Sequence, residues 1–154
     1  MKTLKTIVCL TLCAIFAAAL FAGCTNGKKN SAQQDPEAVF TRILNEVKFA
    51  ETLEDSTEYA EYSIGELPEN VAAKIYTGSG RNADCAMLFT AENAEELSAV
   101  EGLVKEYLAS MKDEAQHYDP EQVPKIENAV FHWGEKSLIV CVTADTETVN
   151  AILN

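Results

Sequence analysis

Basic side chains are scarce in this 154-residue sequence, where 12 lysines and arginines stand against 24 aspartates and glutamates and give a formal net charge of −12 at pH 7. Nucleic acid is therefore disfavoured as a partner, because binding to phosphates requires positive charge. The same excess of acid opposes adsorption onto anionic lipid or anionic wall polymers.

Motifs for metals, phosphates and cofactors are missing as well. The two histidines, His117 and His132, do not form an H-x-x-x-H pair, and no pair of cysteines completes a zinc-binding set. The acidic runs lack the D-x-D-x-D-G spacing of a calcium loop. The glycine-containing segment Gly78–Arg81 lacks the Lys-Ser or Lys-Thr of a phosphate loop. We therefore predict no catalytic residue, no metal site and no cofactor.

Charged residues are also missing from Thr6 to Ala22, a stretch that follows the basic segment Met1–Lys5. A short basic segment before an apolar run is typical of a signal peptide. A bilayer-spanning helix needs about 20 apolar residues, and this run is slightly shorter and ends in small residues. A permanent transmembrane anchor is therefore the second choice.

The segment Leu20–Cys24, LFAGC, resembles the lipobox of bacterial lipoprotein precursors, although Phe21 stands where leucine is usual. The resemblance implies that the Cys24 sulfur forms a thioether with a diacylglyceryl group and that the chain is then cleaved between Gly23 and Cys24. The alternative is an ordinary signal peptide cut after the alanines Ala17–Ala19, with Cys24 unmodified.

Lipidation of Cys24 would make membrane lipid a partner of the chain. Two or more fatty-acyl chains, such as palmitate, meet the two-signal requirement for stable attachment. We therefore expect a protein of the cell membrane that is lipid-anchored and faces outside the cytoplasm. Residues 1–23 are predicted to be the signal peptide, and residues 24–34 the lipidated cysteine and a flexible tether. Residues 35–154 are long enough for one domain with a core.

Hydrophobic spacing predicts alternating helices and strands in this domain. A helix is expected to start at Asp35-Pro36-Glu37. Residues 51–70 lack a clear period, so we expect an irregular segment with about one helical turn. Strands are predicted at 71–77 and 83–90, joined by a glycine-containing hairpin loop. Asn93 is expected to cap a long helix, with Glu96 completing a capping box.

The second half repeats this pattern. A short helix is predicted from Asp119, because a proline and an acid follow a capping residue there. Strands at 129–133 and 137–144 are expected to meet at a glycine-first turn, Gly134-Glu135. A closing helix is predicted from Asp145. Two hairpins separated by a long helix predict an α+β fold, a mostly antiparallel sheet with helices packed on it.

Two segments, AAKIYTGSGRNADCAMLFTA and HYDPEQVPKIENAVFHWGEKSLIVCVTAD, resemble the bacterial lipoprotein family that carries the domain of unknown function 4358. The resemblance covers about residues 45–154. Cys85 departs from it, because an acidic residue is expected there in relatives. The resemblance implies a membrane-tethered extracytoplasmic domain, and it carries no established activity over to any residue.

Five cysteines are present. Cys9 and Cys13 would leave with the signal peptide and Cys24 would carry lipid, so Cys85 and Cys141 remain, each in a predicted strand. Two buried, inert thiols are the favoured interpretation. A disulfide between them is the alternative, and it requires adjacent strands with both side chains on one face.

Three residues are candidates for ligand binding, namely Ser79, Arg81 and His132. Glycines around Ser79 let backbone amides approach an anion, and Arg81 can clamp a carboxylate or phosphate. A hairpin loop with a solvated arginine is the favoured alternative, because the segment leads into a strand. His132 is expected to point away from its strand neighbours Phe131 and Trp133. Three tyrosines near the acidic segment form a second candidate surface: Tyr59, Tyr62 and Tyr76.

Two functions from different classes follow. The favoured one is a binding or scaffold module that holds an extracytoplasmic protein or a small ligand at the outer face of the cell membrane. The alternative is a small hydrolase or metal-dependent enzyme that uses His132, His117 or Cys85.

Overall fold

A five-stranded antiparallel sheet organises the part of the chain that the computed structural model describes, residues 34–154. The order of the strands across the sheet is β1-β2-β3-β5-β4. Their bounds are β1 Glu54–Asp55, β2 Ala72–Thr77, β3 Cys85–Thr90, β4 Val130–Trp133 and β5 Ser137–Val142. The predicted signal peptide, Cys24 and all but the last residue of the predicted tether lie outside the described residues.

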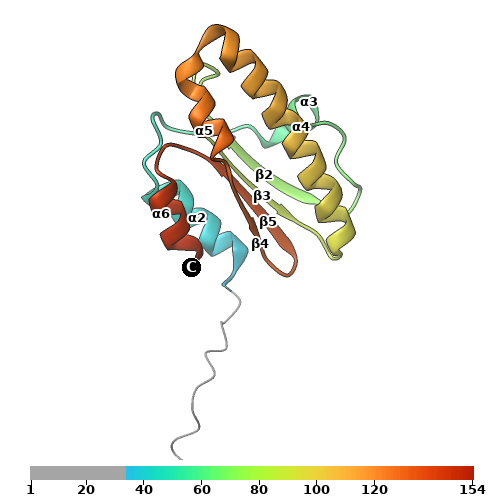
Figure 1. Ribbon diagram of the computed structural model, residues 1–154. Helices are drawn as coiled ribbons and strands as arrows, with labels where there is room; N and C mark the ends of the chain where they lie inside the picture. The colour runs from blue at the N-terminus through green and yellow to red at the C-terminus, as the bar shows by residue number, and fades with distance from the viewer. Residues whose placement is uncertain (1–33) are drawn as a thin grey trace, which may run out of the picture. The chain divides into compact units, whose positions relative to one another are not determined.

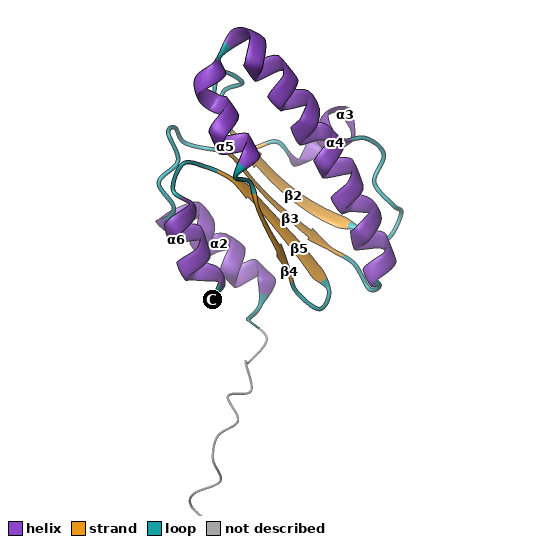
Figure 2. Ribbon diagram, viewed as in Figure 1, coloured by secondary structure: helices purple, strands orange, loops and turns teal. Residues whose placement is uncertain are grey.

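Helices cover both faces of this sheet (Figures 1 and 2). One face carries the long helix α4 (Ala94–Tyr118) with the short helices α3 (Ala60–Ile64) and α5 (Val123–Glu127). The other face carries α2 (Pro36–Glu46) and α6 (Thr146–Leu153). The result is the predicted α+β fold in three layers, with two hydrophobic cores separated by the sheet.

The central strands β3 and β5 are apolar because helices cover both faces of the sheet. Every residue of β5 and all but the last of β3 are buried. Met87 and Phe89 point into the core beneath α4, and Leu88 and Ile139 point toward α2 and α6. A strand covered on both faces has no solvent face to fill with polar residues, so CAMLFT and SLIVCV read as continuous apolar runs.

Side-chain caps fix the starts of three helices. Asp35, Asn93 and Asp145 accept hydrogen bonds from backbone amides of the first turn of α2, α4 and α6, at 3.1, 3.0 and 3.3 Å. The predicted capping box on α4 is half right, because the Glu96 carboxylate accepts from Asn70 Nδ2 at 3.0 Å. Glu96 therefore ties the preceding loop to α4 and does not bond back to the cap.

Residues 51–70 contain more structure than their weak hydrophobic period predicts. They hold β1, the 3-10 turn η1 (Thr57–Tyr59) and α3. Ser56 donates its amide to the Ile75 carbonyl at 2.8 Å, and Thr57 Oγ1 accepts from the Ile75 amide at 3.0 Å. These contacts satisfy the outer edge of β2, so long-range pairing decides the structure of this segment.

The β4–β5 turn differs from the glycine-first turn that we predicted. Gly134 donates its amide to the Ser137 carbonyl at 2.8 Å, which places Glu135 and Lys136 at the corner. Gly134 is not among the described glycines with positive φ, which are Gly65 and Gly80. The turn is therefore centred one residue later, and no left-handed glycine is needed in it.

Candidate functional site

The length of α4 creates an overhang at one end of the sheet. A helix of 25 residues extends about 38 Å, whereas a strand of six residues extends about 20 Å. The C-terminal half of α4 therefore runs past the ends of the strands, and the chain returns to β4 through the turn η2 (Pro120–Gln122) and α5 (Figure 1). A gap remains beneath the overhang.

This gap is an open groove of about 790 Å³, a size typical of ligand pockets. Its walls are η1 and α3, the β2–β3 loop, and the C-terminal half of α4. Buried apolar side chains form the floor, namely Ile64, Ile75, Met87 and Ile126. Exposed side chains form the rim, namely Tyr59, Ser63, Arg81, Ser110, Glu114 and Tyr118. The groove thus combines an apolar floor with a polar rim.

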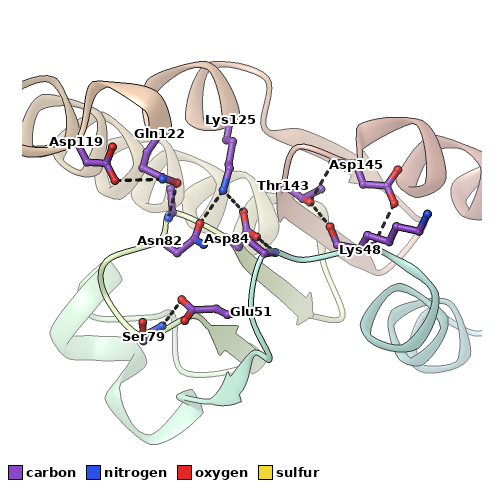
Figure 3. A network of polar contacts seen from close by, with 12 residues as sticks. Lys48, Glu51, Ser79, Asn82, Asp84, Asp119, Gln122, Lys125, Thr143 and Asp145 are labelled. Atoms are coloured by element: carbon purple, nitrogen blue, oxygen red, sulfur yellow. Dashed lines mark hydrogen bonds and ion pairs between the residues drawn. The ribbon is translucent and has the colours of Figure 1, made fainter.

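A buried ion pair fixes the wall made by the β2–β3 loop (Figure 3). Lys125 Nζ from α5 lies 3.0 Å from Asp84 Oδ1 and donates to Asn82 Oδ1 at 2.7 Å. The Asp84 side chain is 1% exposed and the Lys125 side chain 16% exposed. In such a place an ion pair is kept only when further hydrogen bonds satisfy its partners.

The segment that follows α2 supplies one of those bonds. The amide of Ala50 donates to the second oxygen of Asp84 at 2.6 Å, and the amide of Lys48 donates to Asp145 at 3.1 Å (Figure 3). The Lys48 amide is the largest of the causes that lower the pKa of Asp145. Asp84 therefore joins three parts of the chain, the β2–β3 loop, α5 and the segment after α2.

The tip of the β2–β3 loop is held separately. Glu51 accepts a hydrogen bond from the Ser79 amide at 2.7 Å, and this backbone bond is the main reason that the pKa of Glu51 is lowered. A Cβ atom on Gly78 would meet the Glu51 carboxylate, so a larger residue there would displace the Glu51 side chain from the Ser79 amide. Gly80 has a φ of +80°, which glycine adopts without strain.

The thiol of Cys85, which lines the groove, is unreactive. Burial raises the pKa of Cys85 to about 12, so its thiolate is not available as a nucleophile near neutral pH. Cys85 pairs with Val142 and faces α4. Cys141 pairs with Ala86, the next residue of β3, so it points to the opposite face of the sheet and packs against α2 and α6. Both thiols are free, so the disulfide alternative does not hold in this structure.

Comparison of the chain with family models, with curated proteins and with solved structures finds no match in any of the three. The resemblance to lipoproteins that carry domain 4358 therefore rests only on the two segments quoted above. Within residues 34–154, no helix is long and apolar enough to cross a bilayer. No group of three His, Cys, Asp or Glu side chains in that range is placed to hold a metal ion.

The structure separates the three candidate ligand residues. Arg81 lines the groove, and Ser79 lies in the same loop, where its amide is bonded to Glu51. His132 lies on the edge strand β4 opposite Ile139, on the sheet face that carries α2 and α6. It points away from the face of Phe131, as predicted, and is not a groove residue. His117 Nδ1 lies 2.7 Å from the Asp113 carbonyl oxygen, outside the groove lining.

The three tyrosines predicted to form a second surface also lie apart from one another. Tyr59 is 60% exposed on the groove rim, while Tyr62 is 98% exposed but outside the groove. Tyr76 packs edge-on against Phe40 with ring centroids 5.9 Å apart, on the opposite face of the sheet. Only Tyr59 of the three predicted tyrosines is therefore available to a ligand in the groove.

Sequence reasoning missed the groove residues of α4 and α5. Tyr107, Met111, Glu114 and Tyr118 all line the groove, at spacings of three or four that continue the apolar stripe of α4. The sequence does contain a sign of the groove, because polar residues follow Met111 in this stripe. A helix face that packs on a core does not normally carry an acid such as Glu114. Burial raises the pKa of Tyr107 to about 12, so its phenol stays protonated as a hydrogen-bond donor.

Proposed function

We propose that this protein is a binding module, tethered outside the cytoplasm by an acylated Cys24, that takes its ligand in the groove between α3 and α4. The groove is the observation that carries the binding part of the proposal. Its rim is built from side chains of four segments, namely η1, α3, the β2–β3 loop and α4, and its loop wall is fixed by the Asp84–Lys125 pair. A site that is held in shape before binding loses less entropy when the ligand arrives.

The tether part of the proposal is supported by the lipobox-like segment Leu20–Cys24 and by the resemblance to the lipoproteins that carry domain 4358. An anchor of this kind would keep the groove close to the membrane surface and restrict its ligands to those found outside the cytoplasm.

The chemistry of the groove does not favour the enzyme alternative. The groove holds Cys85 as a protonated thiol, and neither His117 nor His132 lines it. A nucleophile needs a base within hydrogen-bond reach, and these three residues do not supply such a pair. Binding is therefore the one function that we propose.

Photo-cross-linking in cells tests the proposal. A photoreactive phenylalanine analogue replaces Tyr118, which is 85% exposed on the groove rim, in the full chain. The matched control carries the analogue at Tyr62, which is more exposed but outside the groove. We expect an adduct of defined mass from position 118 and none from position 62.

Mass spectrometry of the intact protein and of its peptides reads the result. The absence of any adduct at position 118, or equal adducts at both positions, would contradict binding in the groove. Equal adducts would indicate that exposure alone determines the cross-linking.

A further inference from the structure

Resting on the proposed function, we propose that the ligand of the groove is a short peptide with free termini, whose carboxylate meets Arg81, whose ammonium group meets Glu114, and whose apolar side chain packs on the floor. Both charged residues line the groove, Arg81 from the β2–β3 loop and Glu114 from α4. The groove therefore offers charges of opposite sign from two different elements.

Neither charge is used by the fold. No ion pair or side-chain hydrogen bond between residues 34–154 includes Arg81 or Glu114. Lys125, which lies behind the lining, is bonded to Asp84 and Asn82. Asp119, a further acid of the lining, accepts from Gln122 Nε2 at 3.2 Å. Arg81 and Glu114 are thus the two charged residues of the lining that make no side-chain contact within residues 34–154.

Charge complementarity selects a ligand that carries both signs. A purely anionic ligand would be attracted by Arg81 and repelled by Glu114, in a chain whose net charge is already −12. A purely cationic ligand would be attracted by Glu114 and by the net charge, but it would be repelled by Arg81. A zwitterion satisfies both groups, and opposed charges also fix its direction in the groove.

The rest of the lining has the chemistry that a peptide backbone needs. Ser56, Asn82 and Gln122 line the groove but already make side-chain hydrogen bonds within the fold. Ser63 and Ser110 line it as well, and neither makes a side-chain hydrogen bond within residues 34–154. They can pair with amide and carbonyl groups, while the floor around Ile75 and Met87 offers burial to an apolar side chain. An extended tripeptide spans about 10 Å, which is compatible with a groove of about 790 Å³.

Calorimetric titration with blocked peptides tests the inference. The full chain, held in lipid nanodiscs, is titrated with the tripeptide Ala-Leu-Ala, with its N-acetylated form and with its C-amidated form. Empty nanodiscs correct for partition into lipid. We expect the free tripeptide to bind and each blocked form to bind about tenfold more weakly, because each has lost one charged hydrogen bond.

Two variants assign each loss to its residue. In Arg81→Gln the free and the amidated tripeptide should bind equally, while the acetylated form stays weaker. In Glu114→Gln the free and the acetylated tripeptide should bind equally, while the amidated form stays weaker. The matched controls are Arg42→Gln, the other arginine of the chain, and Glu106→Gln on the exposed surface of α4. Both controls should keep the full discrimination.

The outcomes separate this inference from the proposed function. Equal binding of all three tripeptides to the unmodified chain would overturn the zwitterion inference and leave a groove that binds apolar side chains. The zwitterion inference also fails if Arg42→Gln lowers the discrimination as much as Arg81→Gln. If none of the three tripeptides binds, the inference is overturned. A cross-link at position 118 would still support the groove as a binding site.

Discussion

Replacement of Lys125 by methionine should destabilise the domain by about 3–5 kcal/mol, because it leaves Asp84 buried without its cation. The Asp84 side chain is 1% exposed, and its remaining hydrogen bond comes from the Ala50 amide. Methionine keeps most of the volume of lysine, so loss of packing contributes little. Urea unfolding of the full chain in lipid nanodiscs, followed by the fluorescence of its one tryptophan, Trp133, measures the change.

Two further variants identify the cause. Lys74→Met removes the exposed ion pair between Lys74 and Glu37, whose side chains are 51% and 47% exposed, and should lower the stability far less, because water screens the pair. Adding Asp84→Asn to Lys125→Met removes the buried charge but keeps an acceptor for the Ala50 amide, so part of the lost stability should return. If Lys125→Met and Lys74→Met cost the same, the buried pair does not hold the groove wall.

Replacement of Cys24 by serine should abolish lipidation completely. A serine hydroxyl cannot form the thioether, and the cleavage implied by the lipobox resemblance follows the modification of Cys24. The variant is therefore expected to carry no label from an alkyne analogue of palmitate and to keep residues 1–23. Click labelling of growing cells, with the intact mass of the purified protein, measures both effects.

Cys13→Ser is the matched control for this prediction. Cys13 lies in the apolar run of the predicted signal peptide, so its replacement should leave both the labelling and the cleavage in front of Cys24 unchanged. An unlabelled parent chain, or equal labelling of the Cys24→Ser variant, contradicts lipid anchoring at this residue.

The regular elements of the fold could be predicted because their sequence patterns are local. Capping residues and apolar stripes mark α2, α4 and α6, and continuous apolar runs mark β3 and β5. The segment with β1 and α3 has no such pattern. Its structure depends on contacts such as Thr57 to Ile75, 18 residues apart, and a single sequence does not reveal such pairs.

The candidate site was harder to predict than the fold. The glycine-containing loop with Arg81 was identified from the sequence. The groove that it lines could not be, because the groove exists only where α4 extends past the sheet. Glu114 and Tyr118 read as ordinary helix surface, and the Asp84–Lys125 pair joins residues 41 positions apart. His132 was the weaker candidate in the sequence, and the structure places it on the edge strand β4 and on the other face of the sheet from the groove.

The central claim is a ligand-filled groove outside the cytoplasm, and labelling of introduced thiols tests both halves of it at once. Ser110 lines the groove and Ser98 lies on the exposed surface of α4 outside it, so Ser110→Cys and Ser98→Cys form a matched pair. The thiols of Cys85 and Cys141 are 1% and 0% exposed and give little background. A maleimide that does not cross the cytoplasmic membrane is added to intact cells and, separately, to the purified full chain.

The account predicts that Ser98→Cys reacts equally fast in intact cells and in purified protein. Ser110→Cys should react as fast as Ser98→Cys after purification but several-fold more slowly in cells, where the ligand covers it. Equal rates for the two thiols in intact cells would contradict an occupied groove. Failure of both thiols to react until the cells are broken would place the domain in the cytoplasm and contradict the account as a whole.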